Sequence, residues 1–164
     1  LLRKALKKLN ILISVLSWFS EKLHRKQSKM PNAFLYNMEG EKKMLKEGQL
    51  TTHFSKKEFA CQCGCGTGEI SMDLVNKLES VRVEYGKAMR INSGIRCLEH
   101  NRKIGSRDTS SHIKCVAADV GCTTMSERLE LLTILLKYFT RVGINKKFIH
   151  VDVDSEKPNG VFLY

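Results

Sequence analysis

Residues 148–153 form a strand-like segment in which apolar residues alternate with His150 and Asp152. Neighbouring side chains of a strand point to opposite faces, so one face of this strand is predicted to be buried. That face consists of Ile149, Val151 and Val153. His150 and Asp152 then share the other face, about 7 Å apart along the strand. The segment requires a sheet with one apolar face, and its polar pair indicates either a solvated face or a functional site.

A second polar group surrounds another short strand, expected at residues 116–120. Its inward-facing residues are predicted to be Val116, Ala118 and Val120, which leaves Asp119 on the open face. His112 lies seven residues before Asp119, an odd offset that would put the two on opposite faces of a regular strand. The two side chains therefore converge only if the chain bends between them, and a flexible residue near the middle would allow that bend.

The remaining pattern supplies helices beside these strands. Ser71 is expected to cap a helix that Gly86 ends. The buried residues of this helix are predicted to be Leu74, Val75, Leu78, Val81 and Tyr85. Residues 124–127 have the Thr-x-x-Glu form of a capping box, which opens a second helix. The buried face of this second helix is predicted to hold Leu129, Leu132, Leu136 and Phe139.

A further strand is expected at residues 89–92, followed by a polar loop at 95–114, and Gly143 is expected to end the connection that precedes the last strand. The order of strand, loop, strand, helix and strand predicts an α+β fold. We expect a small, largely antiparallel sheet with flanking helices.

The net charge of +11 is unevenly distributed over the 164 residues. Residues 1–30 hold eight basic residues and one acidic residue, so they are predicted to form a separate basic, apolar-rich helix. Residues 31–49 are expected to be a linker, and residues 50–164 a single domain. Because the basic excess lies mainly in the first segment, no nucleic-acid partner is expected for the domain.

The N-terminal helix has several interpretations. Its apolar run at residues 11–19 is too short to span a bilayer. A basic start before a short apolar run is typical of a secretion signal, although no small-residue cleavage site follows. Contact with a membrane surface, packing on the domain, and an upstream sequence foreign to the protein are the alternatives.

Two histidines and one carboxylate are a standard ligand set for hydrolytic zinc, with the fourth position left for water. Zinc lowers the pKa of that water towards about 7. His112, Asp119 and His150 are such a set, although a chain with five histidines offers triplets of this kind by chance. The spacing of these residues is therefore a weak signal by itself.

The motifs Ser110-x-His112-x6-Asp119 and Phe-Ile-His-Val-Asp at 148–152 resemble those of the zinc D-Ala-D-Ala peptidases. The small catalytic domain of phage and bacterial cell-wall peptidases is the most similar part of that family, and Hedgehog-type signalling domains resemble this zinc fold. Residues 50–66 are similar to the opening of that domain, and residues 91–101 to its S-G-x-R-C-x-x-H-N stretch. The resemblance spans residues 50–154 and leaves residues 1–49 uncovered.

The resemblance implies that His112, Asp119 and His150 bind one zinc ion. It implies that Arg96 anchors a substrate carboxylate or carbonyl, for which its planar guanidinium is suited. Ser110 is expected either to hydrogen-bond in the site or to shape the loop.

Two positions depart from the family pattern. Several relatives have an acid three residues before the last zinc ligand, where this chain has Lys147, so Asp152 becomes the expected general base. Orientation of His150 is the alternative role for Asp152. The family usually has glycine where this chain has Cys115, which could lower activity, compete for zinc or be harmless.

Five further cysteines accompany Cys115, three of them in the cluster Cys61-x-Cys63-x-Cys65. Disulfide pairing, for instance with Cys97, is one interpretation, and reduced thiols in a tight glycine-rich turn is another. A second zinc site ranks third, because the usual C-x2-C spacing of zinc knuckles is absent.

The function expected from the resemblance is a zinc metallopeptidase that hydrolyses peptidoglycan stem-peptide bonds next to D-residues, as a carboxypeptidase or an endopeptidase. It would act on the cell wall and as a monomer. The alternatives are a zinc-stabilised cell-wall binding module of the same fold, and a membrane-associated protein that acts through residues 1–30.

Overall fold

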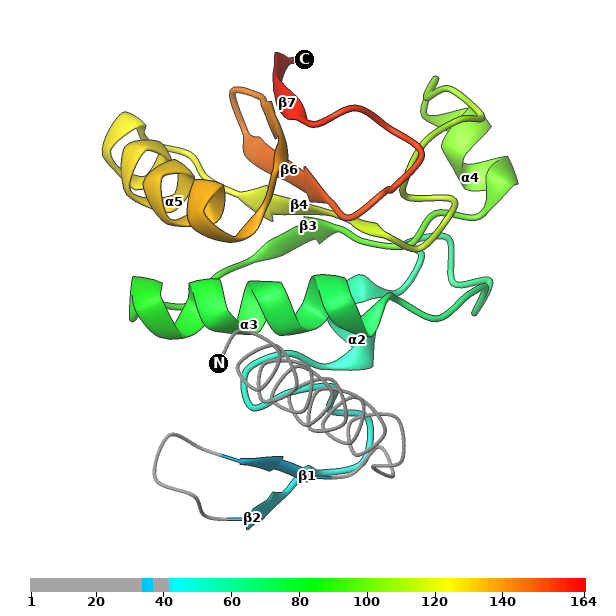
Figure 1. Cartoon of the computed structure of the whole chain (residues 1–164). Coiled ribbons are helices and arrows are strands. Elements are labelled where there is room, and N and C mark those ends of the chain that lie inside the picture. Colours follow the sequence, from blue (N-terminus) through cyan, green and yellow to red (C-terminus); the bar gives the residue numbers. More distant parts are fainter. Residues whose placement is uncertain (1–33, 37–41) are drawn as a thin grey trace, which may run out of the picture. The chain divides into compact units, whose positions relative to one another are not determined.

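The chain divides into two units, Leu1–Met44 and Leu45–Tyr164, and the computed structural model describes residues 34–36 and 42–164 (Figure 1). In the first unit, β1 (Phe34–Tyr36) pairs antiparallel with β2 (Lys42–Met44). Both strands lie within the residues expected to be a linker. The predicted basic helix of residues 1–30 lies outside the described residues. Among the helices that are described, none has the length and apolar character needed to cross a membrane.

The second unit is built on a five-stranded sheet with the order β3-β4-β6-β5-β7. The strands are β3 (Ile91–Ser93), β4 (Ala117–Gly121), β5 (Arg141–Ile144), β6 (Phe148–Asp152) and β7 (Gly160–Leu163). All neighbours are antiparallel except β5 and β7, which are parallel. The predicted α+β class is confirmed, with a sheet that is mixed rather than wholly antiparallel. Gly143 lies inside β5 and does not end a connection, which corrects the expectation for this residue.

Four helices accompany the sheet, namely α2 (Lys56–Phe59), α3 (Met72–Tyr85), α4 (Leu98–Lys103) and α5 (Met125–Tyr138). Helix α3 begins after Ser71 and ends at Gly86, whose left-handed φ of 68° suits a residue without a β-carbon. The five residues predicted to be buried in α3 are all buried. Apolar spacing and a glycine stop were therefore sufficient to define this helix.

Helix α5 starts where the capping box predicts, but the face that it turns inward agrees only in part with the predicted one. Thr124 Oγ1 accepts the backbone N–H of Glu127, while the Glu127 carboxylate accepts from the N–H of Thr123. The predicted face was wrong for Leu129 and Leu136, which are 69% and 46% exposed, and right for Phe139, which is buried, and for Leu132, which packs against the core. The residues buried in the helix are Leu131, Ile134 and Leu135. The sequence offers two apolar stripes at helical spacing, and packing against α3 and β6 selects one of them.

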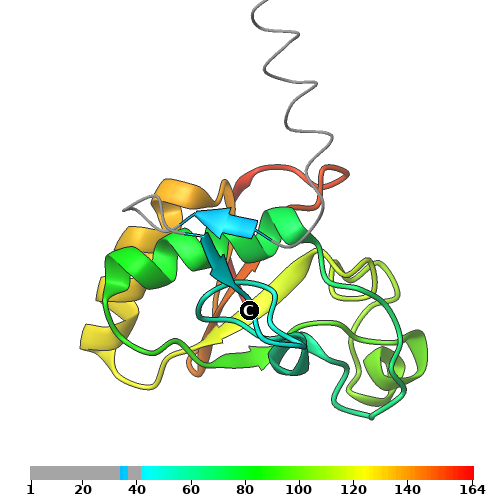
Figure 2. The ribbon, with the colours of Figure 1, turned by 90° about the horizontal axis from the view of Figure 1, so that it is seen from below.

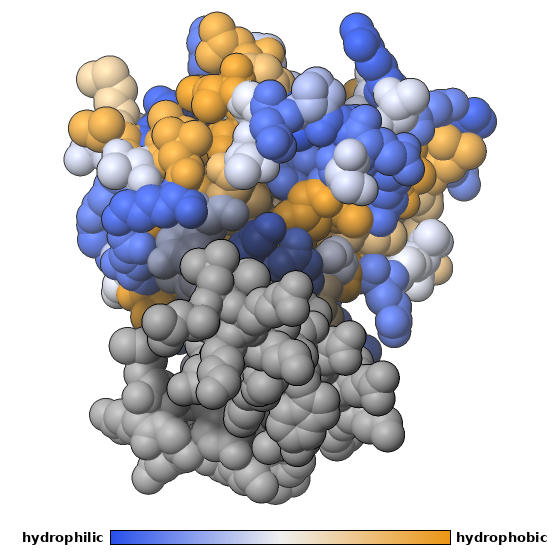
Figure 3. Space-filling model, viewed as in Figure 1, coloured by the Kyte–Doolittle hydropathy of each residue, from blue (hydrophilic) through white to orange (hydrophobic). Residues whose placement is uncertain are grey.

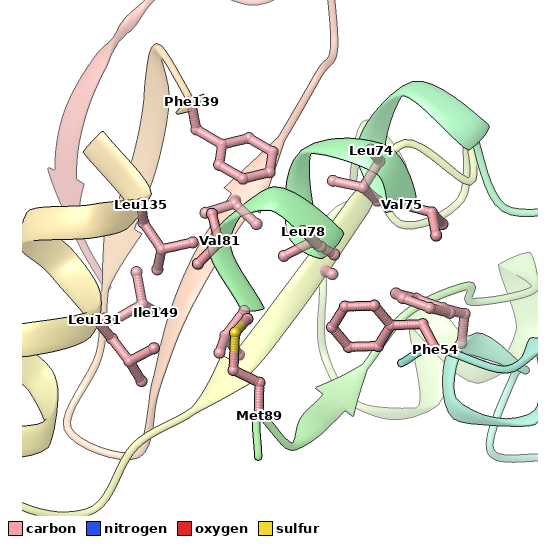
Figure 4. Close-up of a cluster of buried hydrophobic side chains, with 14 of the residues drawn as sticks. Phe54, Leu74, Val75, Leu78, Val81, Met89, Leu131, Leu135, Phe139 and Ile149 are labelled. Atoms are coloured by element: carbon pink, nitrogen blue, oxygen red, sulfur yellow. The ribbon is translucent and has the colours of Figure 1, made fainter. Parts of the chain in front are cut away.

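The core lies between the two long helices and one face of the sheet. Helices α3 and α5 run side by side, and their apolar side chains meet those of the strands (Figures 2 and 4). Ile149 and Val151 of β6 belong to this core, as the alternation along β6 predicts. Phe54, which precedes α2, packs into the same cluster and is 1% exposed. The opposite face of the sheet is left for the polar residues of β4 and β6.

Candidate metal centre

The pairing of β4 with β6 places Asp119 directly opposite His150. Both side chains point away from the core face, because Ile149 and Val151 on either side of His150 belong to the core. Cross-strand neighbours in an antiparallel pair have β-carbons about 5 Å apart, so the two polar groups are brought together by the register alone.

His112 reaches the same site through a tight loop before β4. The backbone N–H of Cys115 donates to His112 O at 3.2 Å, and that of Val116 donates to Ser111 O at 3.2 Å. Cys115 has a φ of 60°, in the left-handed region that favours glycine. This bend resolves the odd spacing between His112 and Asp119, and it occurs at the position where a flexible residue was expected.

The three predicted ligands converge on one point. His112 Nε2 lies 3.2 Å from Asp119 Oδ1 and 3.3 Å from His150 Nδ1, and His150 Nδ1 lies 2.9 Å from Asp119 Oδ1. The sequence placed Asp119 and His150 on an open face, but their residues are only 3% and 4% exposed. Two aromatic rings cover His150, that of Phe162 in β7 with its centroid 5.9 Å away and that of Tyr164, which follows β7, with its centroid 5.7 Å away.

Hydrogen bonds outside the triplet set the tautomers of both histidines. His112 Nδ1 lies 2.5 Å from Gly94 O, which can only accept, so Nδ1 carries the proton and Nε2 has a free lone pair. His150 Nε2 lies 3.0 Å from Asp152 Oδ2. When Nε2 donates to that carboxylate, His150 Nδ1 also presents a lone pair to the centre.

The buried charges influence one another strongly. Burial by itself would raise the pKa of Asp119, but in the absence of a metal protonated rings of His112 and His150 donate hydrogen bonds to this carboxylate, outweigh burial and hold its pKa well below the usual range. Burial would lower the pKa of His150, but its hydrogen bonds to Asp119 and Asp152 raise it above the ordinary value. The site therefore favours a carboxylate anion and a positive charge beside it.

A zinc ion fits this donor set. Two imidazole nitrogens with lone pairs and one carboxylate oxygen form a group whose atoms all lie within 4.8 Å of one another. Zinc takes nitrogen and oxygen donors at about 2.0–2.2 Å in a tetrahedral arrangement, which places neighbouring ligand atoms near the separations found here. A cation would also relieve the conflict between two lone pairs that face each other.

Arg96 contacts the triplet from the loop before α4. Its Nη2 donates to Asp119 Oδ2 at 2.7 Å, and its Nε donates to Ser93 Oγ at 2.9 Å. The Arg96 side chain is 12% exposed. Arg96 thus holds the carboxylate oxygen that faces away from the histidines, a contact that the sequence did not predict.

Asp152 lies behind His150 rather than among the converging atoms. Its Oδ2 accepts from His150 Nε2 and from Arg141 Nε, both at 3.0 Å, and its Oδ1 accepts from the backbone N–H of Asp154 at 3.1 Å. These bonds occupy both oxygens of Asp152. Arg141, which the sequence analysis did not single out, is the cation that compensates this buried carboxylate.

Ser110 and its neighbour Ser111 shape the loop that carries His112. Ser110 Oγ accepts from the backbone N–H of His112 at 3.4 Å, and Ser110 O accepts from that of Ile113. Ser111 Oγ donates to Asp154 Oδ2 at 2.9 Å, and Lys114 Nζ lies 3.0 Å from Asp154 Oδ1. Asp154 therefore ties the loop to the end of β6. Asp154 and Ser111 were missed because only tertiary structure brings them together.

The two departures from the family pattern lie at the margin of the site. Lys147 is in the turn before β6 and lines a different pocket from the one that holds His150. Cys115 does not belong to the group of converging ligand atoms. Burial raises the pKa of the Cys115 thiol, which keeps it protonated at neutral pH.

The centre opens into a cleft of about 780 Å³ between the 104–111 loop and the C-terminal strand. The cationic residues that line this cleft are Arg96, Arg107, Arg141 and Lys157. Asp119 is the one acidic residue in its lining among the residues described. Apolar residues gather at the side of this unit that carries β7, and they give one wall of the cleft an apolar character (Figure 3).

Two histidines and an aspartate at the base of a cleft define a mononuclear metal site of the hydrolytic type. A model of the family Peptidase M15 matches residues 52–152, which include the three converging residues, Arg96 and Asp152. The chain therefore belongs to Peptidase M15, the family of zinc D-Ala-D-Ala peptidases. A search of curated proteins found no match to the chain.

Proposed function

We propose that this chain is a zinc metallopeptidase that hydrolyses peptide bonds next to D-residues in peptidoglycan stem peptides. The observation that carries the proposal is the convergence of His112 Nε2, Asp119 Oδ1 and His150 Nδ1 within 3.3 Å of one another. Membership in a family of metallopeptidases supplies the reaction class. The same membership supports action on cell-wall peptides, outside the cytoplasmic membrane.

The charge of the cleft supports an anionic substrate. Four cationic side chains line the cleft, among them Arg141, which pairs with Asp152, and Arg96, which pairs with Asp119, the one acidic residue in the lining within the described part of the chain. Stem peptides carry free carboxylates, and an Arg guanidinium binds a carboxylate through two parallel hydrogen bonds. We propose that Arg96, assisted by Arg107 from the facing loop, anchors the carboxylate next to the scissile bond, with Ser110 beside them in the lining.

Zinc, when bound by His112, Asp119 and His150, would polarise the scissile carbonyl and lower the pKa of a water molecule. The chain contributes the orientation of these ligands. Gly94 O holds the ring of His112, and Asp152 holds the ring of His150. The geometry favours the orienting role of Asp152 over the role of general base, because both of its oxygens already accept hydrogen bonds.

A zinc-stabilised binding module of the same fold is the second candidate function. It is favoured by the composition of the cleft, which has no carboxylate besides Asp119 in the described lining to take a proton from water. Lys147 stands where several relatives carry an acid. The fold by itself does not decide between the two functions.

Cleavage of defined substrates tests the proposal. The zinc-loaded full chain is incubated with purified peptidoglycan and with a stem pentapeptide that ends in D-Ala-D-Ala, and products are identified by mass spectrometry. We expect loss of a D-residue or cleavage of a cross-link, no cleavage of the same peptide ending in L-Ala-L-Ala, and no activity in His150→Ala. A folded, zinc-loaded chain that sediments with peptidoglycan but cleaves neither substrate would support the binding module instead.

A further inference from the structure

A second group of metal-binding side chains lies outside the candidate metal centre. The Sγ atoms of Cys61, Cys63, Cys65 and Cys97 all lie within 4.8 Å of one another. The Cys63 Sγ is 3.3 Å from the Cys61 Sγ and 3.6 Å from the Cys97 Sγ. A tetrahedral zinc ion with sulfur ligands at about 2.3 Å would hold its sulfurs at separations of this size. All six cysteines lie in the described part of the chain, and each is a free thiol there.

The backbone explains why a Cys-x-Cys-x-Cys spacing can place three thiols together. Gly64 and Gly66 both adopt the left-handed conformation, with φ values of 78° and 68°. The N–H of Gly64 donates to Cys61 O at 3.0 Å, which closes a tight turn. In an extended chain Cys61, Cys63 and Cys65 would share one face about 7 Å apart, whereas the turn at each glycine brings their side chains inward.

Hydrogen bonds to sulfur prepare these side chains to act as anionic ligands. The backbone N–H of Cys97 donates to Cys61 Sγ at 3.4 Å, and the N–H of His100 donates to Cys97 Sγ at 3.3 Å. His100 Nδ1 lies 3.3 Å from Cys61 Sγ. Donors of this kind stabilise a metal-bound thiolate and orient it, as hydrogen-bond partners of the ligands do around other metal sites.

We propose that Cys61, Cys63, Cys65 and Cys97 bind a second zinc ion. Four thiolate ligands complete a tetrahedron and leave no position for water, so the role of this ion is structural. It would join the 61–66 loop to the start of α4, two segments separated by more than thirty residues.

The position of this ion relates it to the candidate metal centre. Cys97 follows Arg96 directly, and Arg96 donates to Asp119. The segment that carries Arg96 and Cys97 is also attached to α2, because the backbone N–H of Ile95 donates a hydrogen bond to Phe59 O at 2.8 Å. Zinc bound to the four thiolates would therefore fix the backbone beside Arg96 and keep its guanidinium at the metal centre. The proposal does not depend on which bond the protein cleaves, or on whether it cleaves one.

Metal analysis of three purified chains tests the proposal. The full wild-type chain is expected to hold two zinc ions, His150→Ala to retain the thiolate-bound ion, and the double variant Cys63→Ser/Cys65→Ser to retain the ion of the candidate metal centre. Cys122→Ala, which removes a buried thiol outside the group, is the matched control and is expected to keep both ions. The double variant should unfold at a lower temperature than the control, because a structural metal contributes to folding free energy.

Cobalt identifies the ligands even if the double variant fails to fold. Cobalt-loaded His150→Ala is expected to show thiolate-to-cobalt charge-transfer absorption, and six thiols should react after denaturation with a chelator in the absence of reductant. Absence of metal from His150→Ala, or fewer than six reactive thiols, would overturn the proposal, the latter in favour of a disulfide. Iron in place of zinc in the freshly purified protein would likewise overturn the assignment of the metal.

Discussion

Cys115 combines a strained backbone with a place between two ligands of the metal centre. Among the described residues it is the one non-glycine residue with a positive φ. A left-handed conformation costs a residue with a β-carbon about 1–2 kcal/mol relative to its ordinary conformations. The strain persists because two backbone hydrogen bonds hold the loop. Cys115 N–H donates to His112 O, and Ser71 N–H donates to Cys115 O.

Replacing Cys115 by glycine should remove this strain. We expect Cys115→Gly to be more stable than Cys115→Ala by about 1 kcal/mol in urea unfolding of the zinc-loaded chain, since both variants lose the sulfur and only alanine keeps the β-carbon. Comparison of the two separates backbone strain from the packing of Sγ against the core. Equal stabilities for the glycine and alanine variants would contradict the strain argument.

Asp152 is a buried carboxylate that influences metal binding through the proposed ligand His150. Its bond to His150 Nε2 fixes the ring that presents Nδ1 to the centre, so Asp152→Asn should weaken zinc binding by about 10–100-fold. Competition with a chelator of known affinity measures this loss. Asp108→Asn is the control, because Asp108 is half exposed and pairs with Arg102, away from the metal centre. If Asp152 were the general base, zinc affinity would stay unchanged and turnover would fall by about 10²–10⁴-fold.

At the scale of elements, local signals predicted some segments and missed others. Helix α3 and strand β6 follow from their own periodicity, and α5 begins at its capping residue. Strands β5 and β7 were not predicted. Each has only four residues, and β7 is formed by parallel pairing with a strand sixteen residues or more before it. Such pairing depends on the tertiary fold, which a local pattern does not contain.

Like the helices and strands, the candidate metal centre was predicted only in part. The metal triplet was predicted from motifs, and the bend at Cys115 agrees with the odd spacing between His112 and Asp119. Burial of the triplet was not predictable, because it depends on β7. Gly143 of β5 permits that cover, since a β-carbon there would lie 2.7 Å from the rings of Phe162 and Tyr164. A glycine within a strand often marks such a close approach, and this signal could have indicated the aromatic cover over His150.

In the molecule as a whole, the basic residues fall into two groups in different parts of the chain. Most of the excess belongs in the sequence to the first thirty residues, whereas four cations of the unit Leu45–Tyr164 line the cleft at the metal centre. This division agrees with the boundary after Met44, because all proposed ligands of both metal ions lie in the unit Leu45–Tyr164.

The second unit should therefore fold and bind metal without the first. A chain that begins at Leu45 keeps the buried side chain of Phe54, which is 1% exposed. It also keeps the hydrogen bond that Thr51 Oγ1 donates to Glu79 Oε2 at 2.8 Å. We expect it to retain the zinc content of the full chain and to change in unfolding free energy by no more than about 0.5 kcal/mol, as for changes away from a core. Calorimetry and metal analysis of the two chains measure these quantities.

A shorter chain provides the matched control for this truncation. A chain that begins at Glu58 loses Phe54 from the core cluster, and removal of a buried phenylalanine side chain costs about 3–5 kcal/mol. It should unfold at a clearly lower temperature than the chain that begins at Leu45. If the longer chain were destabilised as much as the shorter one, residues 1–44 would contribute to the core of the domain. The domain boundary would then have to move toward the N-terminus.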